Sequence, residues 1–287
     1  MKFLYLPIER IDSRYTSHLD RDILEHLDKN KIEYQYLYPE MNGFPERKLP
    51  EGMFLDAPFT IGFKNAQLTD LALLYYNNKI DDDDIIFASD LWFPGLCESV
   101  AYLNHFCNKR VKIRGIIHAG SWVPSDSVAA LERWAKGFED NIFDIVDLIY
   151  VGSQFIKKEI IQKRICDPNK IVITPLPLDV NELNNYLNIP KKDFILFNGR
   201  NHPEKQPELF RKLAKVLTER YEAKYQKENP YLFILTCDNN FTKNEYYGIL
   251  SQAKAVVSFA LQENFGYGIA EAAYLGCIPV VPNRLVY

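Results

Sequence analysis

The sequence lacks a strong charge of either sign and any long apolar run. Its 34 basic and 38 acidic residues leave a formal net charge of −4, so no overall basic field favours nucleic acid as a partner. No apolar run reaches membrane-spanning length, and the charged residues Glu9 and Arg10 follow the start too soon for a signal peptide. With 47% hydrophobic and 25% charged residues, the composition predicts a globular protein without a membrane span, which we expect to be cytoplasmic.

Patterned cysteines and one kind of glycine-rich turn are also missing. The chain has 5 cysteines, scattered and without metal-ligand spacing, which we interpret as reduced core thiols. A run of four acidic residues at 81–84 precedes a predicted strand and is typical of a solvated turn, so we expect no metal ion. No predicted strand is followed by Gly-x-Gly-x-x-Gly, which disfavours a nicotinamide-dependent oxidoreductase.

The first part of the chain alternates apolar runs with amphipathic segments. Short apolar runs predict strands, and apolar residues at helical spacing predict helices. The strands are predicted at 2–8, 32–38, 85–88, 112–117, 148–151 and 170–175, and the helices at 16–30, 96–107, 126–140 and 153–164. Residues 41–64 include several prolines and glycines and have no clear period, which predicts a long surface loop. Strands that alternate with helices predict a doubly wound sheet.

A proline-containing break separates this alternation from a second one. We predict an N-terminal Rossmann-like domain at 1–178, a hinge at 179–192 and a C-terminal Rossmann-like domain at 193–287. The second domain contains further predicted elements, the strands at 194–197, 231–236, 255–260 and 277–281 and helices at 243–253 and after Gly266. The predicted class is α/β with two doubly wound domains, the second short at its C-terminal end.

Near its end the chain reads as strand, loop, helix and strand. Glu263 precedes this helix, and Glu271 falls in its first two turns. Free N–H groups at a helix start attract anions, so the backbone at Asn264, Phe265 and Gly266 is predicted to hold a phosphate while the two carboxylates accept hydrogen bonds from hydroxyls. A phosphate between two polyol-binding carboxylates indicates a nucleotide sugar.

This segment resembles the donor-binding signature of retaining glycosyltransferases with the GT-B fold, of the broad group-1 type. The resemblance lies in Glu263-Asn-Phe-Gly-Tyr-Gly-Ile-Ala-Glu271 and in the later Gly-Cys-Ile-Pro-Val-Val. Gly199-Arg200, followed by Glu-Lys205, resembles the family's basic diphosphate-binding pair. The resemblance implies that this pair and Gly199 hold the diphosphate of a donor such as a UDP- or GDP-sugar, while Glu271 binds ribose hydroxyls and Glu263 sugar hydroxyls. It implies no cofactor besides this donor and no metal.

Further candidates follow predicted strands of the first domain, where α/β folds bind ligands. In the resembled family a histidine at the place of His118 contacts the transferred sugar, so the resemblance assigns that role to His118; the alternative is a histidine satisfied in the core. Asp90 and Trp92 are acceptor-site candidates, although a tryptophan at a helix start equally serves packing. The loop at 9–15 has no glycine, unlike its counterpart in the family, which leaves its role open.

The sequence therefore predicts a metal-independent enzyme that transfers a hexose or pentose from a nucleotide sugar with retention of anomeric configuration. The acceptor stays open. Residues 283–287 resemble a segment of tRNA-queuosine mannosyltransferases, and the first half resembles putative bacteriophage glycosyltransferases, which points to nucleic acid; the acidic balance favours a saccharide, lipid-linked or protein acceptor. The alternative function is a sugar-nucleotide-binding subunit without independent catalysis.

The second predicted domain has fewer elements than its counterparts in the resembled family. Three explanations remain open at this point: a natively short product, a truncation, or a domain completed by a partner. A second copy of the chain, in a homo-oligomer, is one such partner.

Overall fold

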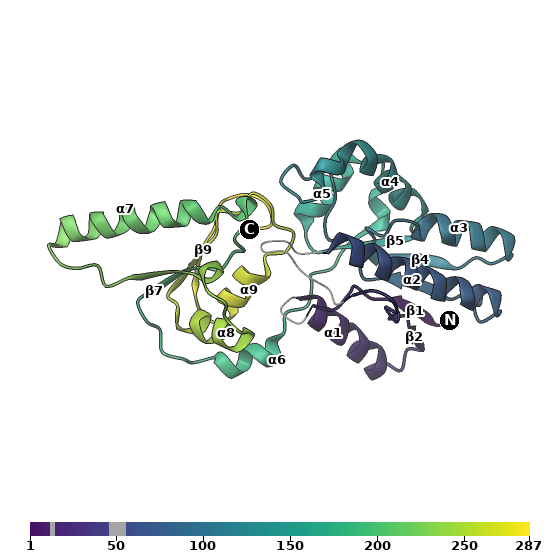
Figure 1. The fold of residues 1–287 in the computed structure, drawn as a ribbon, viewed down its shortest axis with the longest axis horizontal. Coiled ribbons are helices and arrows are strands. Elements are labelled where there is room, and N and C mark those ends of the chain that lie inside the picture. The colour runs from purple at the N-terminus through teal and green to yellow at the C-terminus, as the bar shows by residue number, and fades with distance from the viewer. Residues whose placement is uncertain (12–14, 46–55) are drawn as a thin grey trace. The chain divides into compact units, whose positions relative to one another are not determined.

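The computed structural model describes residues 1–11, 15–45 and 56–287, which form two compact units, Met1–Pro177 (unit 1) and Leu178–Tyr287 (unit 2). Each unit has its own parallel sheet (Figure 1). Buried apolar side chains form one cluster in unit 1 and two clusters in unit 2. Parts of the predicted loops at 9–15 and 41–64 lie outside the described residues. The predicted class, α/β with two Rossmann-like sheets of which the second is smaller, is confirmed.

Among its described residues, unit 1 forms a sheet of six parallel strands in the order β2-β1-β3-β4-β5-β6. The strands are β1 (Phe3–Leu6), β2 (Tyr34–Tyr36), β3 (Ile85–Ala88), β4 (Lys112–Ile116), β5 (Leu148–Val151) and β6 (Ile171–Ile173). The helices between them are α1 (Tyr15–Lys29), α2 (Ala57–Tyr76), α3 (Leu96–Phe106), α4 (Glu132–Ile145) and α5 (Gln154–Lys163).

The strand order of unit 1 reverses between β1 and β3. The chain moves from β1 toward one edge at β2, and every later step runs toward the other edge. Right-handed crossovers therefore place α1 on one face of the sheet and α2 to α5 on the other. This reversal is the topological switch point, where open α/β sheets bind ligands beyond the carboxyl ends of the strands.

Alternation along the strands gives the two faces of this sheet different side chains. The face under α2 to α5 is aliphatic and forms the main core, which includes Leu4, Ile86, Ile113 and Ile149. The opposite face is aromatic: the ring centroid of Phe87 lies 5.9 Å from that of Tyr5 and 6.0 Å from that of Tyr150. Both faces are apolar, as expected for a parallel sheet.

Two predictions for unit 1 were wrong. Residues 57–64 were predicted as loop, but they form the first turns of α2, where Asp56 accepts a hydrogen bond from the N–H of Phe59. Apolar residues occur on most sides of α2, so its sequence shows no clear helical period. The helix predicted at 126–140 begins only at Glu132, because Asp126 first stabilises a turn by accepting the N–H of Val128.

Unit 2 forms a sheet of four parallel strands among the described residues, in the order β10-β9-β7-β8. The strands are β7 (Phe194–Phe197), β8 (Leu232–Leu235), β9 (Ala255–Val257) and β10 (Ile278–Val280), and the helices are α6 (Val180–Leu183), α7 (Pro207–Tyr225), α8 (Lys243–Gln252) and α9 (Tyr267–Tyr274). The predicted hinge at 179–192 contains α6, whose Leu183 is buried in the core of unit 2. The strand order reverses between β7 and β9, the switch point of this sheet.

Candidate functional site

The switch point of unit 2 brings two distant sequence motifs together. One motif follows β7 and contains Arg200 and Lys205; the other follows β9 and contains Glu263. Because β7 and β9 are neighbouring parallel strands, their carboxyl ends lie at the same edge of the sheet. The two loops are also joined directly, since the N–H of Leu261 donates to the carbonyl oxygen of Glu204 at 2.8 Å.

Both cations of the first motif are paired with carboxylates. Arg200 donates to Oε1 of Glu204 at 2.6 Å, and Lys205 donates to Oε2 of Glu263 at 3.1 Å and to the carbonyl oxygen of Gln262 at 2.7 Å. Glu204 is 6% exposed and also lies 3.8 Å from Lys205, so it faces both cations. Two positive charges held close together in this way suit a diphosphate.

Glu263 links the cationic motif to the start of α9. Besides the contact with Lys205, its Oε1 accepts the N–H of Gly266 at 3.2 Å. Gly266 has φ of +84°, a left-handed conformation that a residue with a side chain adopts only with strain. A helix therefore starts just after Gly266, as predicted, and the carboxylate of Glu263 accepts the N–H of Gly266 at this start.

Glu271 lies on α9 and is held by two tyrosines of α8. The hydroxyl of Tyr247 donates to its Oε1 at 3.0 Å, and that of Tyr246 donates to its Oε2 at 3.2 Å. Burial raises the pKa of Glu271 above its usual value, although the two tyrosine hydrogen bonds oppose the shift. Sequence reasoning missed both tyrosines; the only available signal was that the pair stands on a helix that precedes the Glu271 motif.

The remaining predicted residues of the second domain lie in the same two loops. A Cβ atom at Gly199 would come within 2.8 Å of the Phe197 ring and 3.2 Å of the Lys205 Cβ, so glycine allows this loop to pack closely. The side-chain Oδ1 of Asn264 is buried and has no hydrogen-bond partner among the described residues. Phe265 packs against Tyr267, with ring centroids 4.8 Å apart.

A pocket of about 190 Å³ opens at the switch point of unit 1. Its lining includes residues after β1, β3 and β4 and residues of α2, among them Glu9, Lys64, Asp90, Trp92, Phe93 and His118. Aromatic and aliphatic walls with a few buried polar groups are typical of small-molecule sites.

His118 lies in this pocket, at the carboxyl end of β4. Its Nε2 lies 2.7 Å from the carbonyl oxygen of Ser89, and because a carbonyl only accepts, Nε2 carries the proton. Burial lowers the pKa of His118, so the ring is neutral at pH 7 and its Nδ1 is an acceptor. A neutral histidine of this tautomer can accept a hydrogen bond from a hydroxyl.

Lys64 is a pocket residue that sequence reasoning missed. Its ammonium group, only 10% exposed, donates to Oδ2 of Asp90 at 2.8 Å and to the carbonyl oxygen of Trp92. Burial opposes ionisation of Asp90, but the charge and hydrogen bond of Lys64, together with the N–H group of Trp92, hold the pKa of this carboxyl below its usual value. Lys64 lies on the part of α2 that was predicted as loop, so no pattern indicated which side of a helix it occupies.

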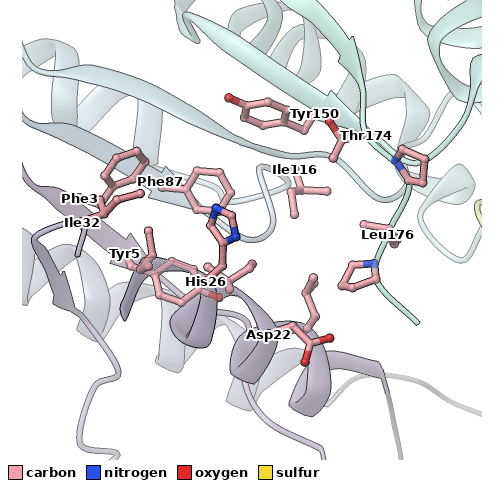
Figure 2. A pocket seen from close by; sticks show the side chains of 15 residues that line it. Phe3, Tyr5, Asp22, His26, Ile32, Phe87, Ile116, Tyr150, Thr174 and Leu176 are labelled. Atoms are coloured by element: carbon pink, nitrogen blue, oxygen red, sulfur yellow. The ribbon is translucent and has the colours of Figure 1, made fainter. Parts of the chain in front are cut away.

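A second and larger groove of unit 1, about 500 Å³, lies over the aromatic face of the sheet, as Figure 2 shows. Its walls are Phe3, Tyr5, Phe87 and Tyr150 together with residues of α1 and 174–177. The groove lies over the face of the sheet opposite the main core, and residues 174–177, just after β6, close one side of it. We therefore do not assign the reaction to it.

The acidic run at 81–84 has structural roles. Asp84 is 2% exposed, and its two carboxylate oxygens accept the N–H groups of Lys2 and Asp81, which holds the start of β1 beside the turn before β3. No group of three or more histidines, cysteines or acidic residues placed to bind a metal occurs in the described part of the chain. Within the same residues, no helix is both long and apolar enough to cross a bilayer.

The paired Rossmann-like units and the two switch-point sites define the class of fold: the chain matches GT-B retaining glycosyltransferases in structure over its whole length. No family model matches its sequence.

Among the similar solved structures, the catalytic domain of starch synthase IV from Arabidopsis thaliana, bound to ADP and acarbose, has a TM-score of 0.61 at 10% identity, over 98% of this chain and 82% of that one. A glycosyltransferase from Rickettsia africae ESF-5 has a TM-score of 0.51 at 14% identity, over 100% of this chain and 80% of that one. A trehalose-6-phosphate synthase studied for glycosyl transfer with retention has a TM-score of 0.56 at 12% identity, over 98% of this chain and 83% of that one. At these identities the likeness is one of fold.

Proposed function

We propose that this protein transfers a sugar from a nucleotide sugar to an acceptor, with retention of anomeric configuration and without a metal ion. The observation that carries the proposal is the contact between Lys205 and Glu263. It joins a cationic motif to a carboxylate and a helix start at the switch point of unit 2, where this fold binds ligands. The similar structures include glycosyltransferases with this architecture.

The donor residues have separate roles in this proposal. Arg200 and Lys205 bind the diphosphate and stabilise the negative charge that it gains as the bond to the sugar breaks. Glu271, oriented by Tyr246 and Tyr247, accepts hydrogen bonds from the ribose hydroxyls. Glu263 accepts hydrogen bonds from sugar hydroxyls once the diphosphate has taken its place on Lys205.

Unit 1 supplies the acceptor pocket and His118. The neutral ring of His118 accepts a hydrogen bond from a hydroxyl of the transferred sugar, and Trp92 and Phe93 give the pocket apolar walls against which a flat group can pack. Two of the charged groups of the pocket, Lys64 and Asp90, neutralise each other. This chemistry suits an acceptor that presents a hydroxyl on a ring.

The test is a transfer assay with the full chain. Radiolabelled UDP-glucose, GDP-mannose and ADP-glucose are each incubated with a set of mono- and oligosaccharides, with tRNA and with duplex DNA, in the presence of a chelator. The proposal predicts label in one acceptor class and its loss in Arg200→Ala. Binding of a nucleotide sugar without transfer or hydrolysis would instead favour a sugar-nucleotide-binding subunit.

A further inference from the structure

A buried carboxylate of α4, Glu139, joins the two loops that carry the pocket residues of unit 1. Glu139 is 0% exposed, and its Oε2 accepts from Nε of Arg164 at 2.8 Å; the Arg164 side chain is only 2% exposed. Taking two charges out of water costs several kcal/mol for each ion, roughly, unless hydrogen bonds replace the lost hydration. The partners of Glu139 therefore decide whether this burial is tolerated.

Those partners come from the loops that follow β3 and β4. The indole Nε1 of Trp92, after β3, donates to Oε1 of Glu139 at 3.0 Å. Ser121, after β4, donates its N–H to Oε1 at 2.7 Å and its hydroxyl to Oε2 at 2.8 Å. When the bond from Arg164 is included, each carboxylate oxygen of Glu139 accepts two hydrogen bonds. The Glu139 side chain therefore binds donors from both loops.

Both loops also contribute to the pocket. Trp92 lines it directly, and Ser121 stands three residues after His118, which lines it too. On its other side, the indole of Trp92 packs edge-on against Trp134 and Phe138, with centroid distances of 5.9 and 5.3 Å. The ring of Trp92 is thus fixed by packing and by one charge-assisted hydrogen bond to Glu139.

We propose that Glu139 is a positioning residue for transfer: it sets the orientation of the Trp92 ring and of the loop after His118, and through them the shape of the acceptor pocket. Glu139 touches neither substrate in this proposal, which rests on the function proposed above. Because a misplacement of about 1 Å can cost roughly 100-fold in rate, loss of the Glu139 charge is expected to slow transfer without affecting the donor residues of unit 2.

The test compares Glu139→Gln with Glu132→Gln. Glutamine keeps the size of Glu139 but replaces one of its two acceptor oxygens by an NH₂ group. That group faces donors in either orientation: Arg164 in one, and the N–H groups of Trp92 and Ser121 in the other. Glu132 is the matched control, because it accepts from Arg164 and its Oε2 lies 2.6 Å from the hydroxyl oxygen of Ser121, but it has no bond to Trp92. The readouts are the indole N–H resonance of Trp92, assigned with Trp92→Phe, and turnover of UDP-glucose, GDP-mannose or ADP-glucose.

In Glu139→Gln the Trp92 resonance is expected to move, and the turnover number to fall by about 10- to 100-fold. Affinity for UDP, GDP or ADP alone stays within about twofold, since those ligands contact unit 2. Glu132→Gln leaves the resonance and turnover near wild type. An unmoved Trp92 resonance in Glu139→Gln, or a parallel loss of nucleoside diphosphate affinity, overturns the proposal.

A second variant covers the case in which Glu139→Gln does not fold. Glu139→Leu combined with Arg164→Met removes both buried charges, a change that is often tolerated in cores. The indole of Trp92 then has no acceptor, so its resonance must move; an unchanged resonance contradicts the proposal. If the wild type turns over none of the three donors, the proposed function fails, while the resonance still decides whether Glu139 fixes Trp92.

Discussion

Lys205 Nζ lies 3.1 Å from Oε2 of Glu263, and this ion pair occupies the two groups that we assign to the donor's diphosphate and sugar. Diphosphate binding on Lys205 would displace Glu263 and free its carboxylate for hydroxyls. The charges of Arg200 and Lys205 are thus balanced by Glu204 and Glu263. On the proposed function, binding of the diphosphate releases the carboxylate that the sugar needs.

Glu263→Gln separates these two steps. Removing the competing negative charge leaves Lys205 available, so UDP, GDP or ADP should bind at least as tightly as to the wild type. Transfer should fall by about 10- to 100-fold, the value of one or two charge-assisted hydrogen bonds. Calorimetry and initial rates measure the two quantities. A parallel loss of diphosphate affinity would show that Glu263 only supports the loop.

Arg200→Ala should weaken nucleoside diphosphate binding by about 10- to 100-fold through the loss of a charged donor. Glu204, the partner of Arg200, is 6% exposed, but it keeps Lys205 at 3.8 Å, so the substitution does not leave its buried carboxylate without a cation. Lys215→Ala, at a side chain that is 77% exposed on α7, is the control. Equal affinities of Arg200→Ala and Lys215→Ala would exclude the assigned role.

Glu271 makes donor binding dependent on pH. Its pKa is raised above the ordinary 4.5 by burial, and only the ionised carboxylate accepts hydrogen bonds from both ribose hydroxyls. Affinity for UDP, GDP or ADP should therefore fall as the pH drops through the raised pKa. Glu271→Gln should bind weakly and without this pH dependence, as calorimetry at a series of pH values would show.

The contribution of Glu271 to folding stability changes with pH in the opposite direction to its contribution to donor affinity. The folded state holds the Glu271 proton to a higher pH than the unfolded chain, so the contribution of this group to stability decreases as the pH rises from 4.5 through the raised pKa. Denaturant unfolding of the wild type and of Glu271→Gln should show the two stability curves diverging in that direction. Parallel curves would mean that the carboxyl is not buried.

Tyr247→Phe removes the hydroxyl that donates to Oε1 of Glu271. Loss of this bond should raise the pKa of Glu271 further and cost about 1 kcal/mol of stability. Donor affinity near neutral pH should fall because the carboxylate loses its fixed orientation. Tyr225→Phe, at a side chain that is 50% exposed, is the matched control. Identical pH profiles of the two variants would contradict the positioning role.

His118 should make unit 1 less stable in acid. Its folded pKa lies below the ordinary 6.5, so its contribution is complete above that pH and is lost as the pH falls from 6.5 toward the folded value. Replacement by glutamine should flatten this part of the stability curve by up to about 1.4 kcal/mol per pH unit. Denaturant unfolding at several pH values measures it; an unchanged slope would mean that the ring charges freely.

Several strands and one helix start could be predicted from strong local patterns in the sequence. The strand at Leu148–Val151 and the strand at Phe194–Phe197 have the bounds that their apolar runs predict, because buried parallel strands are continuous in hydrophobicity. The helix that follows Gly266 could be predicted because glycines stand on both sides of it, Gly266 before its start and Gly276 after its end.

What could not be predicted depends on long-range contacts. Lys64 reaches Asp90 from 26 residues away, and Glu139 reaches Trp92 across 47 residues. Neither partner has a local motif, since an isolated charge on a helix looks the same whether it is buried or solvated. Lys205 and Glu263 do stand in motifs, and both were expected to bind ligand, but their mutual ion pair joins residues 58 positions apart and was not predicted.

The most direct test of the account is calorimetric titration of the full chain with UDP-glucose, GDP-mannose and ADP-glucose in the presence of a chelator. The account predicts binding of at least one of them by the wild type, and affinity reduced about 10-fold or more in Lys205→Ala and in Glu271→Gln, as expected for the loss of charged hydrogen bonds. Binding of none of the three, or binding that neither substitution weakens, would contradict the claim that unit 2 holds the donor.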